Sequence, residues 1–215
     1  MIISHKHRFV FVAVPKVASQ SIRLAFRPFL ADGDEEQATL FDKLYSTDPH
    51  MAAKGHGHFT ASELKEHLGP GVWNSYFTFG FVRNPWERFA SWAQFRLAKD
   101  PNFYRFPTLF MKAAIVSGRA EKDLWAKPQT DFLCGENNEL LVDYVGKLET
   151  TTEALENISA AIGLPVSGIS RLNTGQQHSY WSWFDSELIS MVGTLYQPDI
   201  QLFAYQAKVL NQRPS

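Results

Sequence analysis

The sequence predicts an α/β fold in three layers (α/β/α), with helices on both faces of a mostly parallel central sheet. Apolar runs of strand length alternate along the chain with segments of helical periodicity. The strand candidates are hydrophobic on both faces, which is typical of parallel strands that helices cover. Near the N-terminus a strand, a tight loop and a helix follow one another, as in the first half of a βαβ unit.

The first strand is predicted at residues 8–14, RFVFVAV, which are rich in Phe and Val and are followed by Pro15. After a polar turn, residues 21–30 carry apolar side chains at helical spacing and predict a helix. Residues 31–58 are mixed in character, with an acidic patch, a short helix and the glycine-rich sequence KGHGH.

A second helix and a second strand are predicted next. Thr60 and Glu63 match the T-x-x-E capping box, so a helix begins there, and Gly69 followed by proline ends it. Residues 75–83, SYFTFGFVR, alternate and then run apolar, which predicts a second core strand.

The following helix has a clear start. Asn84 suits the N-cap position and Pro85 the first helical position, so a helix is expected over residues 85–98. Residues 100–139 predict helices and loops without defined boundaries.

The last part of the chain predicts one more strand and several helices. Residues 140–148 form the third strand candidate, and Thr150 with Glu153 matches a second capping box. The helix that this box opens is expected to stop at Gly163. Residues 185–208 predict two amphipathic helices.

Composition and charge narrow the class of protein. The 215 residues fit a single domain over residues 1–215, with 45% hydrophobic and 20% charged residues. The formal net charge of -1 gives no reason to expect nucleic acid as a partner. Cys134 is the only cysteine, which excludes an internal disulfide and favours a cytoplasmic location. The apolar run near the N-terminus is too short for a signal peptide or a membrane span, so no membrane partner is expected.

The loop VPKVASQS, residues 14–21, is a candidate anion site between a buried strand and a helix. The first amides of a helix and its dipole favour a phosphate or sulfate. Lys16 adds a cation, Ser19 and Ser21 add hydroxyl donors, and Ala18 allows a close approach. The loop is not a Walker A motif. The alternative is that Ser19 only caps the helix and Lys16 is a solvated loop residue.

The stretch FTFGFVRNPWERFASW, residues 77–92, is a second candidate anion site. Arg83 ends a strand, at the edge of the sheet where open α/β folds bind ligands. Its planar guanidinium suits a phosphate, and Ser91 can point back towards the same anion. The alternative is that Arg83 binds a carboxylate of the protein and Ser91 is a helix surface residue.

Together the two segments resemble the signature pair of the sulfotransferases that use PAPS (3′-phosphoadenosine 5′-phosphosulfate). In that family a P-K-x-[GA]-[ST]-x-[ST] loop holds the 5′-phosphosulfate, and an Arg with a Ser eight positions later holds the 3′-phosphate. The resemblance implies a fold like that of P-loop NTPases. KGHGHFTASEL is similar to a segment of the carbohydrate and bacterial branch. Many relatives have Gly where this chain has Ala18. The matching positions in this chain are Pro15, Lys16, Val17, Ala18, Ser19, Gln20, Ser21, Arg83 and Ser91.

The resemblance also implies a mechanism, in which a hydroxyl attacks sulfur in line with the leaving phosphate of PAP (3′-phosphoadenosine 5′-phosphate). Lys16 would stabilise charge on the bridging oxygen, and His58 would act as general base, with His56 as the second choice. Alternatively these histidines are surface residues, or half of a metal site together with His5 and His7. No metal is expected.

The acceptor is expected to be a hydroxyl of a carbohydrate or small metabolite, and the sequence does not indicate an oligomeric state. An aromatic stretch near the C-terminus either lines the acceptor site or packs in the core. A P-loop kinase or NTPase and a non-catalytic nucleotide-binding protein are the alternative functions. The aromatic stretch consists of Tyr180, Trp181, Trp183 and Phe184, preceded by Gln177 and His178.

Overall fold

The computed structural model describes residues 1–39, 43–166 and 180–208. These residues group into two compact units. Unit 1 comprises the described parts of Met1–Val82 and Asp131–Asn173, and unit 2 the described parts of Arg83–Thr130 and Thr174–Ser215. That the whole chain forms a single domain stays a prediction.

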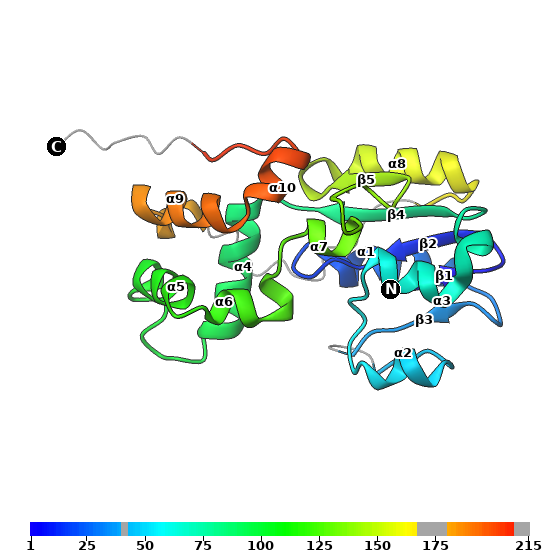
Figure 1. Ribbon diagram of the computed structural model, residues 1–215, viewed down its shortest axis with the longest axis horizontal. Coiled ribbons are helices and arrows are strands. Elements are labelled where there is room, and N and C mark those ends of the chain that lie inside the picture. The colour runs from blue at the N-terminus through cyan, green and yellow to red at the C-terminus, as the bar shows by residue number, and fades with distance from the viewer. Residues whose placement is uncertain (40–42, 167–179, 209–215) are drawn as a thin grey trace. The chain divides into compact units, whose positions relative to one another are not determined.

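A five-stranded sheet of order β3-β1-β2-β4-β5 forms the centre of unit 1 (Figure 1). Strands β2, β4 and β5 run parallel to one another, whereas β1 is antiparallel to both of its neighbours. The fold is therefore α/β, as predicted, but the sheet is mixed rather than mostly parallel. The strands are β1 (Ile2–Ser4), β2 (Phe9–Val12), β3 (Glu35–Glu36), β4 (Phe77–Val82) and β5 (Tyr144–Lys147).

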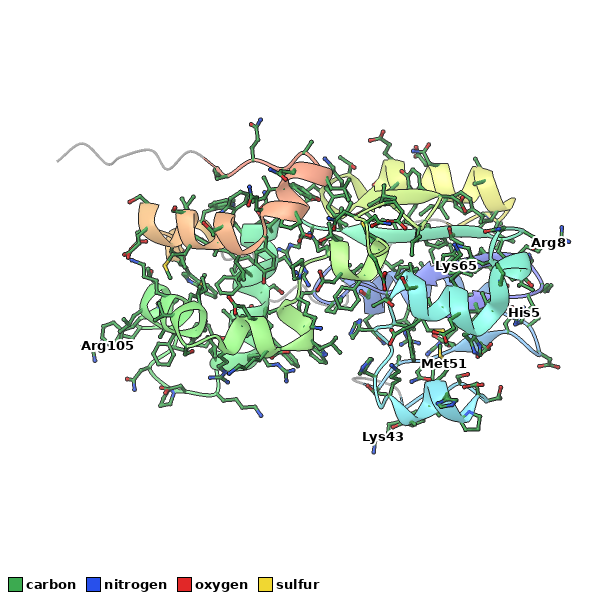
Figure 2. All side chains as sticks on the ribbon, viewed as in Figure 1. His5, Arg8, Lys43, Met51, Lys65 and Arg105 are labelled. Atoms are coloured by element: carbon green, nitrogen blue, oxygen red, sulfur yellow. The ribbon has the colours of Figure 1, made fainter. Side chains whose placement is uncertain are left out.

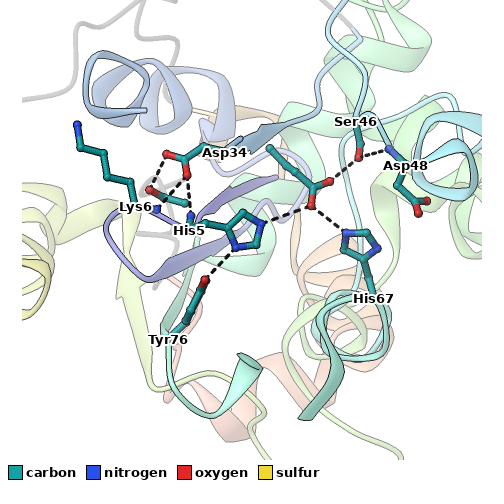
Figure 3. A network of polar contacts seen from close by, with 9 residues as sticks. His5, Lys6, Asp34, Ser46, Asp48, His67 and Tyr76 are labelled. Carbon is teal, nitrogen blue, oxygen red and sulfur yellow. Dashed lines mark hydrogen bonds and ion pairs between the residues drawn. The ribbon is translucent and has the colours of Figure 1, made fainter. Parts of the chain in front are cut away.

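A tight turn joins β1 to β2, which makes this pair of strands antiparallel. Only antiparallel strands can be joined by so short a connection. The Asp34 carboxylate holds the turn, because it accepts hydrogen bonds from the Ser4 hydroxyl (2.8 Å) and from the backbone amides of His5 (2.7 Å) and Lys6 (3.1 Å), as Figure 3 shows. Strand β1 is three residues long, too short to carry a periodic pattern in the sequence.

Helices α1 (Ser19–Phe26) and α8 (Thr151–Ile162) cover one face of the sheet. Phe26 of α1 packs with ring centroids 5.6 Å from Phe9 and 5.2 Å from Phe79. A Cβ added at Gly146 of β5 would lie 2.9 Å from the Cβ of Ala154 in α8 and 2.8 Å from the Phe81 ring, so α8 approaches this face closely.

Helices α3 (Ala61–Trp73) and α7 (Thr130–Leu133) lie on the opposite face. A Cβ at Gly80 would come within 2.5 Å of the Leu133 side chain. On α3, the His67 Nε2 atom lies 3.0 Å from Glu35 (His67 is labelled in Figure 3). The Glu35 side chain lies on the same face of the sheet as its register partner Ile3. Unit 1 thus has helices on both sides of its sheet. Helix α2 spans Pro49–Ala53.

Most of the predicted helix ends in unit 1 are correct. Thr60 and Glu63 form both hydrogen bonds of the capping box, at 3.1 and 2.8 Å, and Gly69 breaks the regular helix with φ 73°. Helix α8 has Gly163 as its left-handed C-cap. The second capping box is wrong, because the Thr150 side chain makes no capping bond and the chain enters α8 from a 3-10 turn, η3, over Leu148–Thr150.

Unit 2 is helical. Its longest helix, α4, begins as predicted, since the Asn84 side chain accepts hydrogen bonds from the amides of Trp86 (3.1 Å) and Glu87 (3.3 Å). Trp92 and Phe89 of α4 are fully buried. Along the described part of the chain, every helix is too short or too polar to span a membrane. The elements of unit 2 are α4 (Pro85–Leu97), α5 (Pro107–Val116), α6 (Arg119–Lys122), η2 (Leu124–Ala126), η4 (Tyr180–Trp183), α9 (Ser186–Leu195) and α10 (Gln197–Leu202).

A buried ion pair joins α1 to the edge strand β3. The Arg23 side chain is 3% exposed and binds both the Glu36 carboxylate and the Gln20 side chain. The Arg27 Nε atom lies 3.1 Å from the same carboxylate. Since Arg23 is out of water, the Glu36 carboxylate contributes to the compensation of its charge.

We expect Glu36→Gln to lower the free energy of unfolding by about 3 kcal/mol, because removing one partner of a buried pair leaves the other charge uncompensated. Urea denaturation measures this quantity. The matched control is Glu187→Gln, the same change in an ion pair whose carboxylate side chain is 71% exposed, where little change is expected. Equal losses in the two variants would contradict the structural role of Glu36.

Candidate functional site

The predicted anion-binding loop has a strained backbone. Lys16 and Ala18 adopt positive φ angles of 66° and 60°. For residues other than glycine this left-handed conformation costs about 1–2 kcal/mol. Such strain persists only where the surrounding structure enforces it, and it clusters at ligand-binding sites. The shape of the loop therefore supports a function beyond connecting β2 to α1.

The N-terminus of α1 follows this loop directly. Ala18 is the N-cap residue and no side chain caps the helix. The Ser19 hydroxyl donates to the carbonyl oxygen of Val14, so Ser19 braces the loop and does not cap the helix. The first turn contains no acidic residue. Half-buried Lys16 stands beside a helix end whose dipole attracts anions.

His58 is held beside the same loop. Its Nδ1 atom lies 2.7 Å from the carbonyl oxygen of Ala13, which is two residues before Pro15. A carbonyl oxygen only accepts, so Nδ1 carries the hydrogen. In the neutral ring Nε2 then has the lone pair that a general base needs. The fold thus brings His58 to the loop from 45 residues away.

His56 lies two residues before His58, and its ring forms a different hydrogen bond. Its Nδ1 atom accepts a hydrogen bond from the backbone amide of His58 at 3.3 Å, which places the proton of the neutral ring on Nε2. Burial lowers the pKa of His56 below its usual value, partly opposed by the charge of Glu63. The lowered pKa favours the neutral form of the His56 ring.

Gln37 supports the segment that carries both histidines, and inspection of the sequence missed it. This buried side chain donates to the carbonyl oxygens of His56 and Met51, each at 2.8 Å. It accepts a hydrogen bond from the Ser46 amide at 3.1 Å. Met51 lies on α2 (Figure 2). A Cβ at Gly57 would lie 2.1 Å from the Gln37 carbonyl oxygen, so only glycine fits there. The glycines of KGHGH were the available signal for such close packing.

Arg83 is the first residue of unit 2 and has partners within that unit. Its Nη2 atom lies 3.1 Å from Glu87, and its guanidinium stands 5.5 Å from the centre of the Tyr180 ring. Arg83 thus contacts a carboxylate of the protein, which the alternative interpretation of this residue expected. Ser91 lies one turn beyond Glu87 on the same face of α4 and is partly exposed.

The aromatic stretch packs on α4 within unit 2. Trp183 and Phe184 are buried, which agrees with core packing for these two. The Trp181 Nε1 atom donates to Glu87 at 3.2 Å, and the Tyr180 hydroxyl donates to Gln94 at 2.9 Å. Gln177 and His178, the other members of the proposed acceptor site, lie outside the described residues.

The described residues contain no group of three His, Cys, Asp or Glu side chains that could hold a metal ion. The Nδ1 atom of His5 lies 2.8 Å from the Tyr76 hydroxyl, and its Nε2 atom 3.9 Å from Glu35 (Figure 3). The partners of His5 therefore come from β3 and from the turn before β4.

A comparison with known protein families gives a match over nearly the entire chain. A family model described as "Sulfotransferase family" matches residues 1–206. A protein from Archaeoglobus fulgidus, described as an uncharacterized protein, is 29% identical over 118 residues, which are 54% of this chain and 92% of that protein. No solved structure matches the chain significantly.

We expect Ala18→Gly to raise the free energy of unfolding by about 0.5–1 kcal/mol. The left-handed conformation strains alanine but not glycine, and this relief exceeds the entropy that glycine loses on folding. Urea denaturation measures the change.

The control for this substitution is Ala160→Gly, at an exposed position inside helix α8. There the same change should destabilise by about 0.5–1 kcal/mol. A loss of stability in Ala18→Gly as well would mean that residue 18 is not held in the left-handed conformation.

Proposed function

Because the chain belongs to the sulfotransferase family, we propose that it transfers a sulfo group from PAPS to an acceptor hydroxyl. The observation that carries this proposal is the pairing, within unit 1, of a strained loop at a helix N-terminus with His58, whose ring is bound to the strand end that leads into the loop. The loop at the helix N-terminus suits the anionic group that is transferred. His58 suits the proton that the acceptor hydroxyl must lose.

The loop from Pro15 to Ser21 is proposed to hold the 5′-phosphosulfate. Its backbone amides and the dipole of α1 favour the negative charge, and Val17 and Gln20 contribute through their amides. Lys16 would stabilise the charge that develops on the bridging oxygen as its bond to sulfur breaks. These interactions are those expected for a fold of the P-loop NTPase type, which we propose for unit 1.

His58 is proposed to accept the proton of the acceptor hydroxyl at Nε2. The hydroxyl oxygen forms the new bond to sulfur, the bond from sulfur to the phosphate oxygen breaks, and PAP leaves. The bond from Nδ1 to Ala13 supports this role, because it fixes both the orientation and the tautomer of the ring. His56 is the less suitable base, since its Nδ1 atom is engaged by the His58 amide and its Nε2 atom carries the proton.

Arg83 and Ser91 are proposed to hold the 3′-phosphate. A guanidinium binds phosphate through two parallel hydrogen bonds, and the serine hydroxyl can donate a further one. The acceptor is proposed to be a hydroxyl of a carbohydrate or small metabolite, with Tyr180 and Trp181 as the half-buried rings that could contact it. Cys134, the only cysteine, is compatible with a cytoplasmic location, which we retain as a proposal.

Nucleotide selectivity tests the proposed function. We expect PAP to raise the melting temperature of the protein, since a ligand that binds only the folded state stabilises it. ATP with Mg²⁺ should have little effect. Incubation with PAPS and a panel of carbohydrates and small alcohols should add one sulfo group to an acceptor, read by mass spectrometry. Stabilisation by ATP with Mg²⁺ and none by PAP would overturn the proposal.

His58→Ala should lower turnover by roughly a hundredfold or more, which is typical for the loss of a general base, and leave PAP affinity little changed. The measurement is initial rate with labelled PAPS, with PAP titrated by calorimetry. His50→Ala, on the exposed surface of α2, is the matched control and should behave like the parent. Unchanged turnover in His58→Ala removes His58 from the mechanism.

A further inference from the structure

The main chain of Arg83 is bound by a glutamine that comes from far along the sequence. The Gln129 Oε1 atom accepts a hydrogen bond from the Arg83 amide at 2.8 Å, and its Nε2 atom donates to the Arg83 carbonyl oxygen at 2.9 Å. The Gln129 side chain is fully buried. Its amide thus satisfies both backbone groups of Arg83, directly after the last hydrogen-bonded residue of β4.

Gln129 is itself held by a buried carboxylate. Asp199 of α10 is fully buried and accepts hydrogen bonds from the backbone amides of Gln129 and Thr130, both at 2.9 Å. Both carboxylate oxygens of this buried side chain thus have a backbone amide as hydrogen-bond donor. The connection therefore runs from Asp199 through Gln129 to Arg83, entirely within unit 2.

The Arg83 side chain is confined as well. The Glu87 carboxylate lies 3.1 Å from its Nη2 atom and the Tyr180 ring is 5.5 Å away. These two contacts hold the Arg83 side chain, and Gln129 holds its main chain, before any anion binds. A binding group that is ordered beforehand gives up less entropy, so its contribution to affinity is larger.

We propose that Gln129 and Asp199 are positioning residues that make Arg83 a selective site for the 3′-phosphate of the donor, an inference that rests on the proposed function. Neither residue touches the nucleotide in this proposal. They act through Arg83, so their effect appears in the preference for PAP over AMP (adenosine 5′-phosphate), which lacks the 3′-phosphate.

The test is a comparison of PAP and AMP affinities by calorimetry. Arg83→Ala should weaken PAP binding about 10- to 100-fold, as expected for lost charge-assisted hydrogen bonds, and change AMP binding little. Gln129→Met, which keeps the length of the side chain but removes both bonds to Arg83, should weaken PAP binding about tenfold with AMP again unchanged. Gln201→Met, at an exposed position of α10, is the matched control and should alter neither.

A double variant separates positioning from general damage. If Gln129 acts through Arg83, then Gln129→Met should cause no further loss of PAP affinity in a protein that already carries Arg83→Ala. A merely structural role would weaken PAP and AMP alike, or lower the melting temperature and leave both affinities unchanged. Either result overturns the inference.

Asp199→Asn is a second variant for the same comparison of PAP and AMP affinities, to be used if the Gln129→Met protein does not fold. An amide offers one acceptor where the carboxylate offers two, so one of the two backbone amides loses its partner and the preference for PAP should fall about threefold to tenfold. If the parent protein binds PAP no better than AMP, the proposed function fails together with the inference. If the parent prefers PAP and both variants keep that preference, only the positioning role is wrong.

Discussion

The parallel pairing of β2 with β4 is the constraint on which the sheet of unit 1 depends. Val12 is the register partner of Gly80, so both strands end at the same edge of the sheet. The loop with Lys16 begins where β2 ends, and Arg83 follows the last residue of β4. Two segments that are nearly seventy residues apart in sequence (Lys16 to Arg83) thus start from neighbouring strands. In open α/β sheets, ligands bind at the edge where the parallel strands have their carboxyl ends.

Buried amide side chains do much of the positioning. Gln37 binds the carbonyl oxygen of His56, and Gln129 binds both backbone groups of Arg83. In each case a neutral side chain with one acceptor and two donor hydrogens satisfies main-chain groups that lie outside regular secondary structure. Leaving such groups without partners inside a protein costs about 1–3 kcal/mol each, which explains why both segments are tied to the core by hydrogen bonds.

Helix ends were predicted correctly from the sequence where they depend on nearby side chains. The Thr60 capping box, the Asn84 cap with Pro85 and the stop at Gly163 depend on side chains within a few residues, and the structure has all of them. Thr150 shows the limit of a local motif, because a preceding 3-10 turn changed the backbone at the helix start. Strands β1 and β3 were missed, since their three and two residues form strands only through pairing with distant segments.

The amino-acid sequence by itself determined the α/β class, the boundaries of the helices with clear capping or stop signals and the residues that carry the family resemblance, because short-range sterics, capping and hydrophobic periodicity depend on neighbouring residues. Only the tertiary structure decided the mixed sheet, the left-handed backbone at Ala18, the contact of His58 with Ala13 and the partners of Arg83. These features arise from hydrogen bonds and packing between segments far apart in the chain. No local pattern encodes which distant amide or carbonyl group a folded side chain will meet.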